Sequence, residues 1–157
     1  MSVMRISDDE WRRAVFALQE RFAERYAGIR VDGTSHPPQH LWVRLVGQED
    51  TDRDVVLELL SQNLPYVNPP ELTWSIKTVR FGLADLEAAL DALDQWIRPR
   101  MLDIDFTTYY VDQDRNSVVL MIPDPDEVSE EVLRELAPRL IDGSVTIVAG
   151  IYEVGPA

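Results

Sequence analysis

The chain repeats one order of helix-like and strand-like segments about 75 residues apart, and this repeat limits its fold more than any other feature. In each copy, a segment with apolar residues at helical spacing precedes two strand-like segments, a second helical segment and a third strand-like one. The order begins again after Gly82. We therefore predict an α+β protein of two tandem α-β-β-α-β units, residues 1–82 and residues 83–157, the second including a C-terminal tail.

In the first copy, the first helix is expected from Asp8 or Asp9 to Ala27, with Gly28 as a left-handed stop. Its apolar stripe is formed by Trp11, Val15, Leu18, Phe22 and Tyr26. The segments that follow predict strands at 29–33 and 40–47, a helix at 48–62 and a strand at 71–79.

In the second copy, a helix is expected between Gly82 and Pro99. It is followed by strands at 102–112 and 116–124, a helix at 126–140 and a strand at 143–151. Pro138 is expected to end or kink the last helix near Ala137, because proline lacks the N–H that a helix interior uses.

Each unit is expected to be a three-stranded mixed sheet with helices on one face. The third strand follows a helical crossover and is expected to run parallel to the second. The expected order of strands in the sheet is second, first, third.

The net charge of −13 is unevenly divided. Residues 1–82 carry 10 basic and 12 acidic side chains, whereas residues 83–157 carry 5 and 16. Contact with a phosphate backbone needs a stripe of cations, so nucleic acid is not expected as a partner. A charged partner of the acidic half should be basic.

Two acidic segments begin with the spacing of a calcium loop, Asp112, Asp114 and Asn116 in one and Asp50, Asp52 and Asp54 in the other. Neither has the glycine or the late glutamate that such a loop needs. A hairpin corner explains the first segment and helix capping the second. His36 and His40 are separated by two prolines, which favours a polar loop over a zinc site. No metal or other cofactor is therefore predicted.

No cysteine is present, and no glycine-flanked serine suits a nucleophile, so no catalytic residue is nominated. The N-terminal residues lack the apolar stretch of a signal peptide, and no run of apolar residues is long enough for a membrane span. The expected location is cytoplasmic.

The most apolar strand pattern, in the second half, predicts a binding surface. Tyr109 and Tyr110 are adjacent, so on a strand they point to opposite faces. Val119 and Met121 alternate with other apolar residues, so that strand is apolar on both sides. One face is expected to contact either the first half or another protein.

The hairpin sequence resembles the prodomains of bacterial serine proteases of the alpha-lytic and streptogrisin type. The resemblance is carried by Val111, Asp112, Asn116, Val118 and Val119. It implies a binding function, in which a sheet edge pairs with a β-hairpin of a protease and a C-terminal tail lies in the protease cleft. In this chain the tail is 151–157, which adds Tyr152 and Val154 to the expected partner-binding residues.

The resulting hypothesis is a non-catalytic protein-binding module that acts through a sheet edge or face and has a prodomain-like role toward a protease. Its partner is another protein or a second copy of this chain. Two alternatives stay open. One is a carboxylate- or metal-dependent hydrolase that uses His36 or His40, and the other is a structural domain of a larger assembly.

Overall fold

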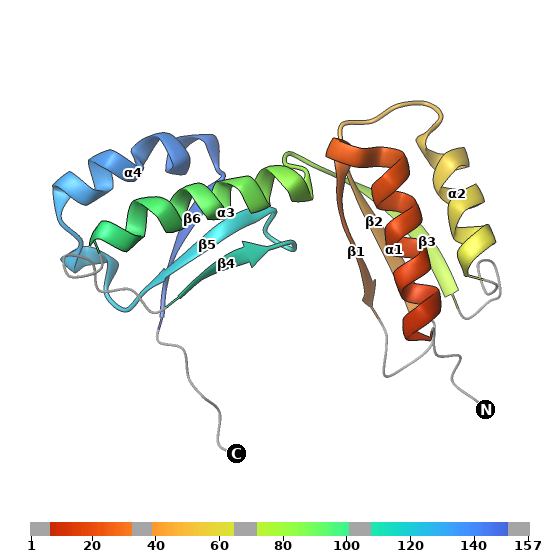
Figure 1. Cartoon of the computed structure of the whole chain (residues 1–157), viewed down its shortest axis with the longest axis horizontal. Coiled ribbons are helices and arrows are strands. Elements are labelled where there is room, and N and C mark those ends of the chain that lie inside the picture. The colour runs from red at the N-terminus through yellow and green to blue at the C-terminus, as the bar shows by residue number, and fades with distance from the viewer. Residues whose placement is uncertain (1–6, 33–38, 65–71, 101–107, 151–157) are drawn as a thin grey trace, which may run out of the picture. The chain divides into compact units, whose positions relative to one another are not determined.

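The computed structural model describes residues 7–32, 39–64, 72–100 and 108–150. The chain divides into two compact units, Met1–Leu83 and Ala84–Ala157. In Figure 1 each unit consists of a three-stranded sheet and two helices.

The first unit contains α1 (Asp8–Phe22), β1 (Tyr26–Asp32), β2 (Gln39–Val46), α2 (Asp52–Asn63) and β3 (Leu72–Val79). At the junction α3 (Leu83–Ile97) begins the second series, which continues with β4 (Thr108–Asp112), β5 (Ser117–Ile122), α4 (Glu130–Asp142) and β6 (Val145–Ala149). The two helices of each series lie on the same side of the sheet (Figure 1). The predicted class, α+β with two α-β-β-α-β units, is confirmed.

In each sheet the first two strands are antiparallel, and the third strand runs parallel to the second, as predicted. The predicted order of strands is wrong, because the sheets are ordered β1-β2-β3 and β4-β5-β6. After helix α2 the chain returns as β3 beside β2, and after helix α4 it returns as β6 beside β5. This order gives the most apolar strand two hydrogen-bonded neighbours, and all but one of the six residues of β5 are buried.

Helix α1 ends at Phe22 and does not reach Ala27 as predicted. A short 3-10 turn, Ala23–Arg25, follows it, and Tyr26 already belongs to β1. Gly28 has a φ of 107° and lies in the strand, where the pairing register with β2 shifts. The side chain of Tyr26 is 3% exposed, and burial raises its pKa to about 12. The apolar stripe therefore continues from helix to strand, and spacing alone could not show where the helix ends.

The first core lies between the sheet and helices α1 and α2. Its buried residues are Ala14, Leu18, Phe22, Tyr26, Leu41, Val43, Leu45, Val56, Leu60, Leu64 and Leu72. Burying an aliphatic side chain of this kind contributes roughly 1.5–3 kcal/mol relative to leaving it in water. The alternate residues of β2 therefore fix which face of the sheet the helices cover.

The second core lies between the second sheet and helices α3 and α4. Its buried residues are Leu93, Ile97, Val118, Leu120, Ile122, Leu136 and Val145. Helix α4 does not end at Ala137 but continues through Pro138 to Asp142. Gly143, with a φ of 82°, provides the left-handed stop. Leu136 and Leu140 hold both sides of the proline against the core.

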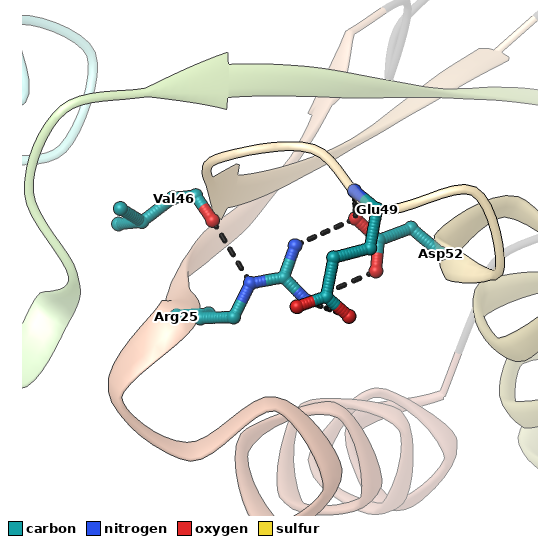
Figure 2. A network of polar contacts seen from close by, with 4 residues as sticks. All are labelled: Arg25, Val46, Glu49 and Asp52. Atoms are coloured by element: carbon teal, nitrogen blue, oxygen red, sulfur yellow. Dashed lines mark hydrogen bonds and ion pairs between the residues drawn. The ribbon is translucent and has the colours of Figure 1, made fainter.

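A polar network joins the 3-10 turn before β1 to the end of β2 and to the start of α2 (Figure 2). Arg25 donates to both carboxylate oxygens of Asp52, at 3.0 and 2.6 Å, and to the backbone oxygen of Val46 at 3.0 Å. Asp52 also accepts from the backbone N–H of Glu49 at 2.9 Å. Asp52 is 4% exposed, and a buried carboxylate needs partners for its charge. The bidentate Arg25 and the backbone N–H of Glu49 are those partners. The network connects three segments of the first unit.

Gly82 has no room for a side chain, because a Cβ atom there would overlap the backbone oxygen of Glu24. We expect Gly82→Ala to lower the free energy of unfolding by about 1–3 kcal/mol, since a backbone atom cannot move aside cheaply. The matched control is Gly150→Ala, whose Cβ would lie 3.6 Å from the Met121 Sδ in ordinary contact. Denaturant titration should show almost no change for the control. Equal stability of both variants would contradict the close approach.

The hydrogen bond from Arg25 holds the pKa of Asp52 below its ordinary value, and the Glu49 N–H acts in the same direction against the effect of burial. This stabilisation is therefore present above the unfolded pKa of about 4 and is lost as pH falls through the lower folded pKa. Asp52→Asn should lower the free energy of unfolding at pH 7 by about 2 kcal/mol and flatten its decline in acid. The control is Glu49→Gln, because that carboxylate is 64% exposed and 3.4 Å from Arg25. Equal losses in both variants would contradict this assignment.

Candidate binding face of the first sheet

The first sheet has a second face, opposite α1 and α2, whose side chains lie outside the first core. Successive residues of a strand point to opposite faces, so the core residues Leu41, Val43 and Leu45 of β2 fix the parity of the whole sheet. We call this the outer face, and it is formed by Arg30, Asp32, His40, Trp42, Arg44, Val46, Thr73, Ser75, Lys77 and Val79. Among them Arg30, Asp32, Thr73 and Lys77 are exposed, whereas Trp42, His40 and Ser75 are half-buried.

One row of polar residues crosses all three strands of the outer face. Asp32 of β1 pairs with His40 of β2, and His40 pairs with Thr73 of β3. The His40 Nδ1 and the Thr73 Oγ1 are hydrogen-bonded at 2.6 Å. The His40 Nε2 is buried and has no hydrogen-bond partner among the residues that the structure describes. The row therefore places a carboxylate, an imidazole and a hydroxyl side by side.

Asp32 also holds the aromatic residue of the outer face. It accepts from the Trp42 Nε1 at 3.0 Å and from the Arg30 Nε at 2.9 Å. The ring of His40 meets that of Trp42 edge to face, with centroids 4.5 Å apart. These contacts fix the orientation of an indole ring that the first core does not use, and fixed aromatic rings are suited to binding.

The charge of the outer face differs in sign from that of the chain. Arg30, Arg44 and Lys77 contribute three positive charges against the single carboxylate of Asp32, while the whole chain has a net charge of −13. A cationic surface on an acidic protein favours an anionic ligand locally.

The arrangement is better suited to binding than to catalysis. A hydroxyl beside an imidazole is the beginning of a nucleophile and base pair. The carboxylate that would orient the imidazole is instead bonded to Trp42 and Arg30, and its row lies on the pleated face of a sheet. A flat face with a rigid aromatic ring and flanking charges matches a protein interface.

Of the residues predicted to bind a partner, Tyr109 lies on the helix side of the second sheet, whereas Tyr110, Val119 and Met121 lie on the other side. Tyr109 packs against the second core and donates a hydrogen bond to Asp94, which is the largest cause of its raised pKa. Tyr110 and Val119 pair across β4 and β5 on the opposite side of that sheet, with exposed fractions of 41% and 1%. Met121 is half-buried on the same side as Val119. The remaining two predicted residues, Tyr152 and Val154, lie outside the described residues.

The calcium-like segments are explained by backbone hydrogen bonds. The Asp112 Oδ1 accepts from the backbone N–H groups of Asp114 and Arg115, at 2.9 and 3.1 Å, and Asn116 has a φ of 51°. These are the features of the predicted hairpin corner.

The second calcium-like segment does not cap a helix as predicted. Asp52 does not cap the first turn of α2 but reaches back to Glu49 and Arg25. Within the four described ranges, no group of three histidine or acidic residues could hold a metal ion, and His36 lies outside them.

A polar pocket of about 490 Å³ lies elsewhere in the first unit, between the start of α1 and the end of α2. It is lined by Ser7, Asp9, Glu10, Arg13, Ser61, Gln62 and Asn63. The Glu10 Oε1 accepts from the Ser7 hydroxyl within the pocket wall. Small-molecule sites are mostly apolar with a few placed polar groups, so this polar and open pocket is the weaker candidate.

Comparison with known proteins gives no relative from which a function could be transferred. No protein-family model matches the chain, and none of the curated proteins compared with it matches either. The resemblance to protease prodomains therefore stays a prediction. Among the helices in the described ranges, none combines the length and apolarity that crossing a bilayer requires.

The sequence interpretation missed Asp32, Trp42 and Thr73 and treated His40 only as a possible metal ligand or as a residue of the alternative hydrolase. The alternation in 40–46 carried a signal, because Leu41, Val43 and Leu45 alternate with the residues of the outer face. What no local pattern showed was the pairing of β3 beside β2, which brings Thr73 to His40. The contact between Thr73 and His40 therefore depends on the pairing register of β2 and β3, which are far apart in the sequence.

The Asp32–Trp42 contact can be measured with a double-mutant cycle. We expect Asp32→Ala and Trp42→Phe to show a coupling of about 0.5–1.5 kcal/mol in unfolding free energy, because each removes the same hydrogen bond. The Trp42 indole N–H resonance should also shift in the Asp32→Ala variant. As a control, Asp54→Ala on the exposed side of α2 should leave that resonance unchanged. Additive effects and an unshifted resonance would contradict the contact.

Proposed function

We propose that this protein is a non-catalytic protein-binding module and that the outer face of the first sheet is its binding surface. The observation that carries the proposal is the hydrogen-bonded set on that face, in which Asp32 orients Trp42 and Thr73 bonds to His40. These side chains lie outside the first core and are held in place by one another. Rigid aromatic residues flanked by polar groups are typical anchors of protein interfaces.

The outer face of the first sheet is a better candidate than the surface expected in the second half. On the face of the second sheet away from the helices, Val119 is 1% exposed, so it has almost no surface to offer a partner. Tyr109 packs against the second core, so Tyr110 is the predicted tyrosine that is exposed on that face. A prodomain-like role toward a protease is a narrower form of the same proposal. It rests on the hairpin sequence from Val111 to Val119.

The proposal can be tested by placing a photo-crosslinking phenylalanine analogue at Ser75, which pairs with Trp42 across the outer face. We expect irradiation in the source cells to capture a defined protein from this position and not from Glu58, an exposed residue of α2. The captured protein, once purified, should bind the chain saturably. Trp42→Ala should weaken that binding at least about tenfold while the variant stays folded by circular dichroism, because Trp42 lies outside the first core. No specific capture from Ser75, or binding that Trp42→Ala does not affect, would overturn the proposal.

A second candidate function, hydrolysis, is favoured by the 2.6 Å contact between Thr73 Oγ1 and His40 Nδ1. In such a reaction the Thr73 oxygen would bond to a substrate carbonyl carbon and its proton would pass to His40. The leaving group would then take that proton, and water would release the acyl group from Thr73. A fluorophosphonate probe should label Thr73 if this candidate is right. Absence of labelling in wild type, with Thr73→Ala as the blank, would remove it.

A further inference from the structure

We propose that the polar pocket of the first unit binds a free amino acid with a cationic side chain, such as lysine or ornithine. The pocket lies between the start of α1 and the end of α2, and its volume of about 490 Å³ is typical of small-molecule sites. It is separate from the outer face, because α1 and α2 cover the opposite side of the first sheet. The described residues that line it all have polar or charged side chains, so its ligand must be polar as well.

An unsatisfied carboxylate oxygen points to a ligand in this pocket. The Glu10 Oε1 accepts from the Ser7 hydroxyl at 2.9 Å, and the Glu10 backbone N–H donates to the Ser7 Oγ at 3.2 Å. These reciprocal contacts hold the carboxylate in place at the start of α1, as in a capping box. The Glu10 Oε2 is buried and has no hydrogen-bond partner among the residues that the structure describes. Leaving such an oxygen unpaired is costly, and a cationic N–H group in the pocket would satisfy it.

The charges of the pocket favour a particular class of cation. Asp9 and Glu10 supply two carboxylates, and Arg13 supplies one guanidinium. Arg13 follows Glu10 by one helical turn but does not bond to its Oε2. A basic amino acid carries two cationic nitrogens and one carboxylate, which complement these three side chains one for one. A simple amine would leave Arg13 without a counter-charge, and a neutral amino acid would leave one carboxylate without one.

The end of α2 adds hydrogen-bond acceptors to the same pocket. Its last three residues, Ser61, Gln62 and Asn63, line the pocket. The last turn of α2, which lies within the described residues, contains no basic side chain. The final carbonyls of a helix lack intrahelical partners and carry partial negative charge, so they attract cations. One cationic nitrogen of the ligand is therefore expected near the end of α2 and the other at the Glu10 Oε2.

The full chain can be titrated with L-lysine while its backbone amide resonances are followed by NMR. We expect saturable shifts at Glu10, Arg13 and Asn63, with a dissociation constant below about 1 mM. Three analogues at equal ionic strength each lack one charged group: lysinamide, Nα-acetyl-lysine and norleucine. Each should bind at least about fivefold more weakly than lysine. The first two also mimic a lysine at either end of a peptide, so they separate a free amino acid from a peptide terminus. No saturable shift, or equal affinity for lysine and any analogue, would overturn the proposal.

Variants test which side chains recognise the ligand. Arg13→Gln should weaken lysine binding about fivefold but leave the affinity for lysinamide unchanged, because that analogue has no carboxylate to lose. Glu10→Gln should weaken lysine binding to a similar extent. Glutamine keeps an oxygen for the Ser7 hydroxyl and also suits a capping box, so this variant should stay folded. The control is Arg12→Gln, at an exposed neighbour outside the pocket, which makes the same change in net charge as Arg13→Gln. Equal weakening by Arg12→Gln and Arg13→Gln, or binding that Glu10→Gln does not affect, would contradict the proposed site.

Discussion

Each sheet of this protein has one helix layer, and most other features follow from that constraint. Two helices can bury one face of three strands, and they bury the face that carries Leu41, Val43 and Leu45 in the first unit. Apolar burial is the main stabilising contribution to folding, so it decides which face the helices take. The opposite side chains are then released from core packing. In the first unit they form a polar and aromatic network, and in the second they include the hydroxyls of Ser117 and Thr146, which contact each other at 2.8 Å.

The two polar networks of the first unit have different consequences for the protein. Arg25 and Asp52 connect the 3-10 turn before β1 to the start of α2, and Asp52 is 4% exposed, so this pair contributes to the fold. Asp32 and Arg30 are about half exposed, and an ion pair in such a place contributes little to stability. The same chemical groups therefore stabilise the unit in one place and orient Trp42 in the other. This difference in burial is why the outer face, and not the Arg25 network, is the candidate site.

Much of the architecture could be predicted because it depends on local periodicity. The order of elements and the two repeated units were readable, since helical and strand spacing differ. The parallel pairing of the third strand followed from the helical crossover before it. The order of strands was not, because it depends on which neighbour a crossover strand joins. Tyr26 shows a second limit, since its apolar side chain fits the helical stripe although the residue lies in β1. Pro138 shows a third, because Leu136 and Leu140 pack on both sides of a residue that usually ends a helix.

The sequence by itself determined which residues of one strand share a face, since parity groups Trp42 with Arg44 in β2 and Ser75 with Lys77 in β3. It also determined the hairpin corner at Asp112, where a side chain bonds to its own backbone. Only the tertiary structure decided which of those residues meet. Thr73 reaches His40, and Lys77 lies beside Arg44, because α2 returns the chain to the free edge of β2 in one register. Register between distant segments is set by the shared core, and no window of the sequence contains it.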